Sequence, residues 1–376
     1  MSRSLLFYEF FAGGGMVRLG LGDGWDCLLA NDFDPLKIRT YTENFGDDHF
    51  KAGDVFDMTV TDCPGQADLA WASSPCQDFS LAGKRAGLAG GRSSAFFGFW
   101  QLMRALNAQG RPPRVIVIEN VVGLLTANAG ADFTALCRAL SESGYSFGAL
   151  EIDARLFLPQ SRPRVFVVAC KGQAPASLID DSPFQTRAVR KARDRLPSGL
   201  AKNWRAWALA APPPRNTDLA AVLEDDAAVA WHAPEVTERW LALMSPAHRY
   251  AAEQRRDQPR SVGTMFRRMR DGKQRAEVRF DGVAGCLRTP RGGSSRQALL
   301  LAGDGQVRTR LLTAREGARL MGLPEDYRLP RAATAALQVI GDGVAVPVAA
   351  HLVRRLIAPL LDSLAHPDRI QTLAAE

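Results

Sequence analysis

The chain has 376 residues, of which 46% are hydrophobic and 23% charged, with a formal net charge of +7 and a sequence pI of about 9.3. This composition is typical of a globular protein with a full core, and the length allows two domains or one large domain with an insertion. No run of about eighteen apolar residues occurs, so we expect no transmembrane helix. The six cysteines form no C-x-x-C pair, which argues against a zinc site or a disulfide framework and favours a reducing cytosol. The basic charge is compatible with a polyanionic partner.

Short β-like runs alternate with amphipathic helical runs over the first 170 residues. A helix is predicted to begin at Asp34 and Pro35, with Asp34 as N-cap, and a second to cover Ala131–Ser143. The alternation predicts an α/β fold with a Rossmann-like, doubly wound, mostly parallel sheet, and ligand chemistry at the carboxyl ends of its strands. The predicted strands are Leu5–Phe10, Trp25–Asn31, Ala67–Ser73, Arg114–Asn120, Phe147–Ala154 and Arg162–Ala169.

The regular hydrophobic periodicity of the sequence is lost after Lys171, where Pro-rich and charged segments occur. Eight Arg or Lys residues accompany two Asp between Arg255 and Arg275. Order returns with Thr313 and Glu316, which fit a capping box at the start of a helix. The predicted domains are a first domain over residues 1–172, an inserted smaller domain over 173–308, a hinge over 309–335, and a C-terminal helix after a Gly turn over 336–376.

A Gly cluster follows the first predicted strand. Gly13 and Gly15 fit the first two positions of G-x-G-x-x-G, but Arg18 occupies the third, so the dinucleotide fingerprint fails. Asp32 ends the second predicted strand, and Asp54 ends the next candidate strand. Two acids and a Gly turn at adjacent strand ends favour an adenosine-type ligand that lacks a pyrophosphate.

Six short motifs then occur in a fixed order along the chain: "FAGGG", "SPCQ", "IENV", "QSRPR", "RLLTAREGARLMGLP" and "IGDGVAVPVA". In these motifs and in their order the chain resembles the DNA cytosine-5 methyltransferases, nearly from end to end. The poorly matching stretch between "VFVVA" and "RLLTARE" lies where that family carries its variable target-recognition domain.

The resemblance implies a catalytic set of Cys76, Glu119, Arg162 and Arg164. Carbon 5 of cytosine is a poor nucleophile until a thiolate adds to carbon 6, which is the role expected of Cys76. Glu119 would protonate ring nitrogen 3, and for that role we expect its pKa to be raised. Arg164 would hold the carbonyl oxygen of the base, and Arg162 would support the loop and the negative charge near the thiolate.

The resemblance also implies S-adenosylmethionine as methyl donor, S-adenosylhomocysteine as product, and no metal. Asp32 would bind the ribose hydroxyls and Phe33 the adenine face. Three positions depart from the family pattern: Glu9 replaces Asp, Met16 replaces Gly, and Asp342 replaces Asn. The expected cofactor residues are Phe11, Gly13, Gly15, Asp32, Phe33, Asp54, Val55, Pro75, Gly341, Asp342 and Gly343.

The expected partner is double-stranded DNA, bound by a monomer in the bacterial cytoplasm. The Gly-rich, basic loop over 78–94 suits a mobile lid. Arginines in the segment Gly285–Gln297 either read guanine in the major groove or only contact phosphates. The expected DNA-binding residues are Gln77, Ser80, Lys84, Arg85, Arg288, Arg291 and Arg296. The sequence leaves open whether a cognate restriction endonuclease accompanies the chain.

Three other functions compete with this interpretation. An RNA (tRNA) cytosine-5 methyltransferase shares the catalytic motifs but usually has a shorter variable region than this chain. A catalytically dead DNA-binding relative would not need Cys76, Glu119, Arg162 and Arg164, all of which are present. A dehydrogenase lacks support because the third Gly of its fingerprint is missing.

Overall fold

A computed structural model describes residues 4–74, 95–288 and 296–366 of the chain. The chain divides into two compact units. The first comprises Met1–Asp153, Pro163–Pro212 and Val348–Glu376, and the second comprises Ala154–Arg162 and Pro213–Pro347.

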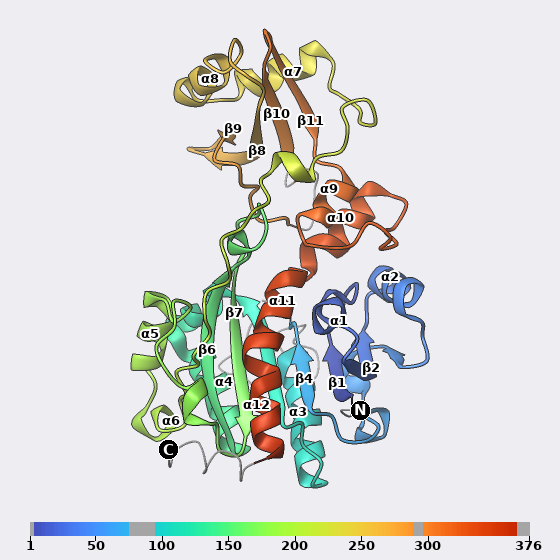
Figure 1. Cartoon of the computed structure of the whole chain (residues 1–376), viewed down its shortest axis with the longest axis vertical. Helices are drawn as coiled ribbons and strands as arrows, with labels where there is room; N and C mark the ends of the chain where they lie inside the picture. The colour runs from blue at the N-terminus through green and yellow to red at the C-terminus, as the bar shows by residue number, and fades with distance from the viewer. Residues whose placement is uncertain (1–3, 75–94, 289–295, 367–376) are drawn as a thin grey trace. The chain divides into compact units, whose positions relative to one another are not determined.

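The first unit is built on a seven-stranded sheet with the order β3-β2-β1-β4-β5-β7-β6 (Figure 1). The pairs from β3 to β5 are parallel, whereas β7 runs antiparallel to both β5 and β6. The predicted doubly wound, mostly parallel sheet is therefore confirmed. Its strands are β1 (Leu5–Phe10), β2 (Trp25–Asp32), β3 (Phe50–Ala52), β4 (Leu69–Ala72), β5 (Val115–Val121), β6 (Tyr145–Asp153) and β7 (Pro163–Lys171).

Helices cover the sheet of the first unit. All of β4 and the first six residues of β5 are buried, as expected for strands covered on both faces. Apolar residues of α3 and α4 share one core cluster with strand residues of the sheet, and Figure 1 shows α12 crossing the other face. Asp34 caps α2 with its carboxylate, and Pro35 is the first helical residue, as predicted. The helices are α1 (Met16–Leu21), α2 (Pro35–Phe45), α3 (Ala95–Ala108), α4 (Ala131–Glu142), α5 (Arg187–Asp194), α6 (Ser198–Ala201), α12 (Ala358–Ala365) and, from Val348 onward, α11 (Val346–Leu352).

The segment that follows β7 packs against the same sheet. The sequence placed residues 173–308 in one recognition domain, but residues up to Pro212 group with the first unit. Trp207 explains this placement: its side chain is fully buried and its indole N–H donates to the Val168 carbonyl of β7 at 3.0 Å. A buried aromatic anchor of this size outweighs the irregular, Pro-rich composition around it.

The second unit contains an antiparallel four-stranded sheet with the order β11-β10-β8-β9 (Figure 1). The sequence showed no regular periodicity here, because the outer part of β8 and the start of β9 carry charged side chains instead of alternating apolar ones. The elements are α7 (Pro234–Ala242), α8 (Pro246–Glu253), β8 (Ser261–Arg270), β9 (Lys273–Arg279), β10 (Ala298–Gly303), β11 (Gln306–Leu311), α9 (Ala314–Arg319) and α10 (Ala333–Asp342).

A buried ion pair fastens α9 to the sheet of the second unit. The guanidinium of Arg310 donates to both carboxylate oxygens of Glu316, at 2.5 and 2.8 Å, and both side chains are fully buried. Glu316 also closes the predicted capping box with Thr313, and it accepts the Glu224 backbone N–H at 3.0 Å. Burying a charged pair is costly unless its remaining hydrogen-bonding groups have partners. The capping box and the Glu224 N–H supply such partners for the Glu316 carboxylate.

The C-terminal region differs in one detail from its prediction. Gly341 and Asp342 form the last turn of α10, where a Gly turn was expected, and Gly343 follows as the C-cap. Beyond α11 a π-helical turn, Val353–Ile357, leads into α12. The run Ala333–Ala365 is long and apolar enough to cross a bilayer, yet 56% of its most apolar window is buried inside the protein, as in a core helix.

We predict that Gly148→Ala destabilises the first unit. A Cβ at this position of β6 would lie 1.9 Å from the Arg205 carbonyl oxygen and 2.8 Å from the Trp207 ring, so backbone must move. Overpacking of this kind costs about 1–3 kcal/mol or more. Urea unfolding should show a lower midpoint for Gly148→Ala, while Gly199→Ala, with open space around it, stays near wild type. Equal midpoints for the two variants would contradict this packing.

Candidate functional site

The turn after β1 lies at the point where the strand order of the sheet reverses. Strand β1 pairs with β2 on one side and with β4 on the other, and ligands of open α/β sheets bind at such a switch point. Phe11, Gly13 and Gly15 all have left-handed backbone conformations, with φ of 56°, 58° and 75°. Glycine adopts these values at no steric cost, whereas Phe11 is strained, and such strain is concentrated at functional sites.

Asp32, at the end of β2, joins this turn to the next one. Its Oδ2 accepts the Gly13 backbone N–H at 2.9 Å, and its Oδ1 accepts the Asp34 N–H at 3.0 Å. The carboxyl group is buried, which raises its pKa, while Lys37 and these N–H groups oppose the rise. Asp32 is thereby held rigidly beside Gly13, where a Cβ would meet nothing within 4 Å.

Two exposed aromatic rings stand near the ends of β2 and β3. Phe33 is 59% exposed and Phe56 is 44% exposed, although large apolar side chains are normally buried. Asp54 does not end a strand as expected: β3 stops at Ala52, and the Asp54 carboxylate instead accepts the Phe56 N–H at 3.1 Å. Val55 is buried beneath this turn.

These residues fit an adenosine-type ligand. They combine a carboxylate, an open Gly backbone and flat apolar rings, which match a ribose diol, a close approach and an adenine face respectively. Phe56 was missed by the sequence reasoning, although its place two residues after Asp54 was a usable sign. Gly341, Asp342 and Gly343 belong to the second unit, and Pro75 lies outside the described residues.

Glu119 and Arg164 form an ion pair at the end of β5. Arg164 Nε lies 3.1 Å from Glu119 Oε1, and the side chains are only 17% and 8% exposed. The pairing follows from register: Val121 of β5 lies opposite Arg164 of β7, so Glu119 is the diagonal neighbour on the same face. Burial favours the neutral acid and the guanidinium favours the carboxylate, so the raised pKa expected for Glu119 stays a prediction.

Asn120 connects β5 to the segment that leads toward Cys76. Its side-chain amide donates to the Ser74 carbonyl at 3.1 Å and to the Ser74 hydroxyl at 3.2 Å, and both residues are buried. The backbone two residues before Cys76 is therefore fixed beside Glu119. The sequence reasoning quoted Asn120 within "IENV" but gave it no role. Cys76 itself, with Gln77, Ser80, Lys84 and Arg85, lies outside the described residues.

Arg162 belongs to the second unit, unlike Arg164. Its guanidinium is buried and donates to three backbone carbonyls: Leu287 at 3.0 Å, Gly341 at 2.9 Å and Gly343 at 2.7 Å. Gln160 is also fully buried and donates to the Leu320 carbonyl while it accepts the Leu287 N–H. Within this unit Arg162 acts as a clamp on backbone, and its expected support of negative charge near the thiolate stays a prediction.

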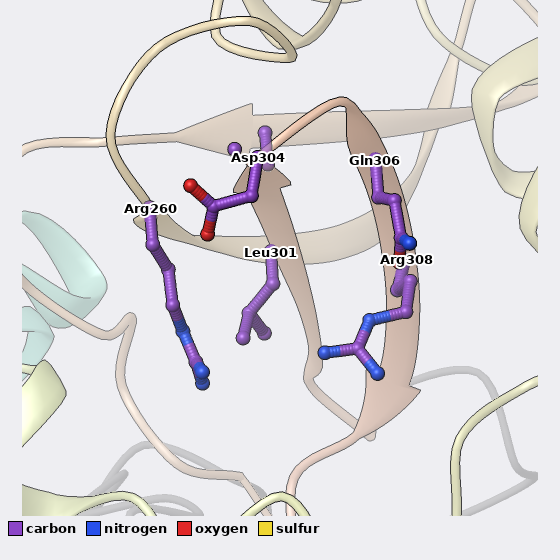
Figure 2. A pocket seen from close by; sticks show the side chains of 7 residues that line it. Arg260, Leu301, Asp304, Gln306 and Arg308 are labelled. Carbon is purple, nitrogen blue, oxygen red and sulfur yellow. The ribbon is translucent and has the colours of Figure 1, made fainter.

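The expected DNA-reading arginines are described only in part. Arg288 is exposed, whereas Arg296 is half-buried and has a lowered pKa because of burial. Arg291 lies outside the described residues. A hollow of about 140 Å³ in the second unit is lined by other residues, among them Arg260, Asp304 and Arg308 (Figure 2). Arg260 and Arg308 share the single carboxylate of Asp226, at 2.7 and 2.9 Å, which compensates one of their two positive charges.

Comparison with protein families resolves the identity of the chain. The family model described as C-5 cytosine-specific DNA methylase matches residues 5–358. The chain belongs to this family. It is a DNA cytosine-5 methyltransferase, and the resemblance inferred from the six motifs is confirmed.

Several relatives of this methylase are type II methyltransferases from bacteria. M.BsuFI of Bacillus subtilis is 29% identical over 92% of this chain and 70% of its own length. M1.ScrFI of Lactococcus lactis subsp. cremoris is 26% identical over 94% of this chain and 78% of its own length. The structure of S. pombe Dnmt2 methyltransferase matches 95% of this chain and 99% of its own, with a TM-score of 0.64 at 18% identity, which supports the fold.

Glu9 is an unusual feature of this methylase. It is 1% exposed at the end of β1, and neither carboxyl oxygen has a hydrogen-bond partner among the described residues. Burial raises its pKa to about 8, and nearby Asp32 adds to the rise while the Arg18 guanidinium opposes it. Arg18 itself bonds to the Tyr41 hydroxyl at 3.1 Å and to His49. The Glu at this position is therefore a buried acid that holds its proton near neutrality.

We predict that Glu9 makes the stability of the methylase fall as pH rises. With a folded pKa of about 8 against an ordinary 4.5, the folded chain keeps a proton that the unfolded chain has released, so unfolding becomes easier as pH rises between these values. Glu9→Gln removes this effect. From about pH 6 to 8, wild type should lose up to about 2–3 kcal/mol relative to the variant, since one pKa unit is about 1.4 kcal/mol.

The measurement is a series of urea midpoints across this pH range. The exposed Glu142→Gln at the end of α4 controls for the loss of one carboxyl group, and its curve should run parallel to wild type. Parallel curves for wild type and Glu9→Gln would show that Glu9 does not hold its proton in the folded chain.

Proposed function

We propose that this methylase modifies cytosine within one specific duplex sequence, takes the target base out of the helix, and attacks its carbon 6 through Cys76. The ion pair between Glu119 and Arg164, beside the backbone that Asn120 fixes at Ser74, is the observation that carries the proposal. Chemistry on a base edge within a duplex requires the base to leave the stack. The buried pair then supplies a rigid acid and cation for a flipped ring.

The roles of the residues follow from the electron flow. The Cys76 thiolate forms a bond to carbon 6, and the electrons of the ring double bond move toward carbon 5. Glu119 donates a proton to ring nitrogen 3, which removes the negative charge that would otherwise build up on the ring. Arg164 orients Glu119 and holds the carbonyl oxygen of the base. Once carbon 5 carries the methyl group and has given up its proton to solvent, ring nitrogen 3 returns its proton to Glu119, and the thiolate leaves and is regenerated.

S-adenosylmethionine, when bound, supplies the electrophilic methyl group and is released as S-adenosylhomocysteine. We propose that Asp32 holds its ribose hydroxyls, that Phe33 and Phe56 pack on its adenine, and that Gly13 and Gly15 allow its close approach. The supporting observations are the fixed Asp32 carboxylate, the two exposed rings and the open space above Gly13. Phe11, Val55, Pro75 and Gly341–Gly343 are proposed as further contacts on the family pattern.

We further propose that the second unit, over 213–347, recognises the DNA, and that the chain acts as a monomer in the bacterial cytoplasm. Its relatives are named type II methyltransferases, which supports a cognate restriction endonuclease as a functional partner. Residues 173–212 are left out of the recognition domain because Trp207 anchors them to the first unit.

Transfer of labelled methyl groups tests the proposed function. Wild type should label duplex DNA and leave tRNA unlabelled, and sequencing of methylated cytosines should give one motif. Cys76→Ser should bind S-adenosylmethionine normally and label neither substrate, because Ser lacks an accessible anion at neutral pH. Labelling of tRNA in place of DNA would overturn the substrate, and turnover by Cys76→Ser would overturn the nucleophile.

We predict that Glu119→Gln lowers the rate of transfer at least about 100-fold, the scale of a lost general acid. The amide keeps the shape of the carboxyl but cannot give up a proton in the same way. Glu151→Gln on β6, where a half-buried carboxylate accepts the Thr186 hydroxyl, is the matched control and should keep the wild-type rate. Single-turnover rates with saturating donor make the comparison. A Glu119→Gln rate within about tenfold of wild type would mean that another group supplies the proton.

A further inference from the structure

The β8–β9 hairpin projects as a two-stranded ribbon from the sheet of the second unit. Strand β8 pairs with β10 only as far as Met265, and beyond this point it pairs with β9 alone among the described strands. Asp271 and Gly272 both have left-handed backbone, with φ of 49° and 72°, which is the two-residue turn that matches the twist of a hairpin. Every residue from Arg267 to Arg275 is exposed.

One face of this ribbon carries like charges directly opposite one another. Arg268 lies across from Arg275, and Arg270 across from Lys273. Such pairs are destabilising, since the charges on opposite strands are close together. Glu277 compensates only one strand, with contacts of 3.3 Å to Arg268 and 2.7 Å to Arg270. Lys273 and Arg275 have no ion pair among the described residues. This face therefore carries uncompensated positive charge that a polyanion can neutralise.

The other face is uncharged at its tip. The guanidinium carbon of Arg267 lies 4.2 Å from the centre of the Trp240 ring, and Trp240 belongs to the hydrophobic core of this unit. Past it, Met269 and Gln274 lie opposite each other, and Met269 is 64% exposed. A Gln amide matches the hydrogen-bonding edge of adenine, and an apolar side chain matches the thymine methyl group, both in the major groove.

We propose that the β8–β9 ribbon enters the major groove of the target duplex, with Lys273 and Arg275 on phosphates and with Gln274 and Met269 at base edges. The major groove, about 12 Å wide, admits a two-stranded ribbon. The inference rests on the proposed action on a specific duplex and assigns the reading of that sequence to two side chains.

The phosphate contacts are tested by the salt dependence of binding. Lys273→Ala and Arg275→Ala, in the full chain, should weaken binding to every duplex and each lower the slope of log affinity against log salt by about one. The methylated motif should stay unchanged. Arg249→Ala removes another exposed cation, which lies on α8 and pairs with Glu253, and should leave the slope as in wild type.

Base reading is tested by the methylated motif itself. Gln274→Ala and Met269→Ala should each relax the preference at one position of the motif by about tenfold, a typical scale for the loss of a single base contact. Duplexes with 7-deazaadenine at one position at a time then locate the contact. Wild type should bind one such duplex more weakly than the normal one, and Gln274→Ala should bind the two alike.

The outcomes separate the ribbon from the proposed function. If wild type methylates one duplex motif but the four ribbon variants keep both its motif and its salt slope, the ribbon is not in the groove. If only the slopes change, the ribbon contacts phosphates and the assignment of Gln274 and Met269 as readers is overturned. If wild type labels no duplex DNA at all, the proposed function fails first. All four positions are exposed, so thermal melting near wild type is expected and excludes misfolding as the cause.

Discussion

The ion pair between Arg164 and Glu119 depends on one topological constraint, the insertion of β7 between β5 and β6 in the antiparallel sense. A parallel strand in that place would begin beside the first residues of β5. A residue other than Arg164 would then lie beside Glu119. Because β7 runs backwards, its first residues lie against the last residues of β5. The pair is thus positioned by backbone hydrogen bonds between core strands and not by a loop.

Local features could be predicted from sequence with high fidelity because their causes are local. The bounds of β1 agree with its prediction, and the Asp34–Pro35 helix start and the Thr313–Glu316 capping box were both confirmed. The family motifs also predicted the order in which the proposed site residues occur along the chain. The hydrogen bond between Asp32 and the Gly13 N–H and the ion pair between Glu119 and Arg164 join residues of different motifs, and no motif by itself reveals these contacts.

Features set by long-range packing could not be predicted in the same way. Residues 173–212 are irregular in sequence, and long-range contacts such as the burial of Trp207 against β7 and the backbone pairing of Phe147 with Trp204 assign them to the first unit. The β8–β9 hairpin carries Asp271 and Gly272, a usable turn sign, but its charged strands lack the apolar alternation that identifies strands. Asn120 reaches Ser74 across the sheet, a contact that no spacing along the chain reveals.

The way in which Arg162 is bound has a consequence for how the sequence around it can change. Its guanidinium binds the carbonyl oxygens of Leu287, Gly341 and Gly343, which every amino acid presents alike. Apart from Cys286, whose sulfur lies 3.3 Å from the guanidinium, side chains on the segments it holds can therefore be replaced without loss of the clamp. A clamp made largely on backbone carbonyls lets the sequence of these segments diverge while the attachment stays the same.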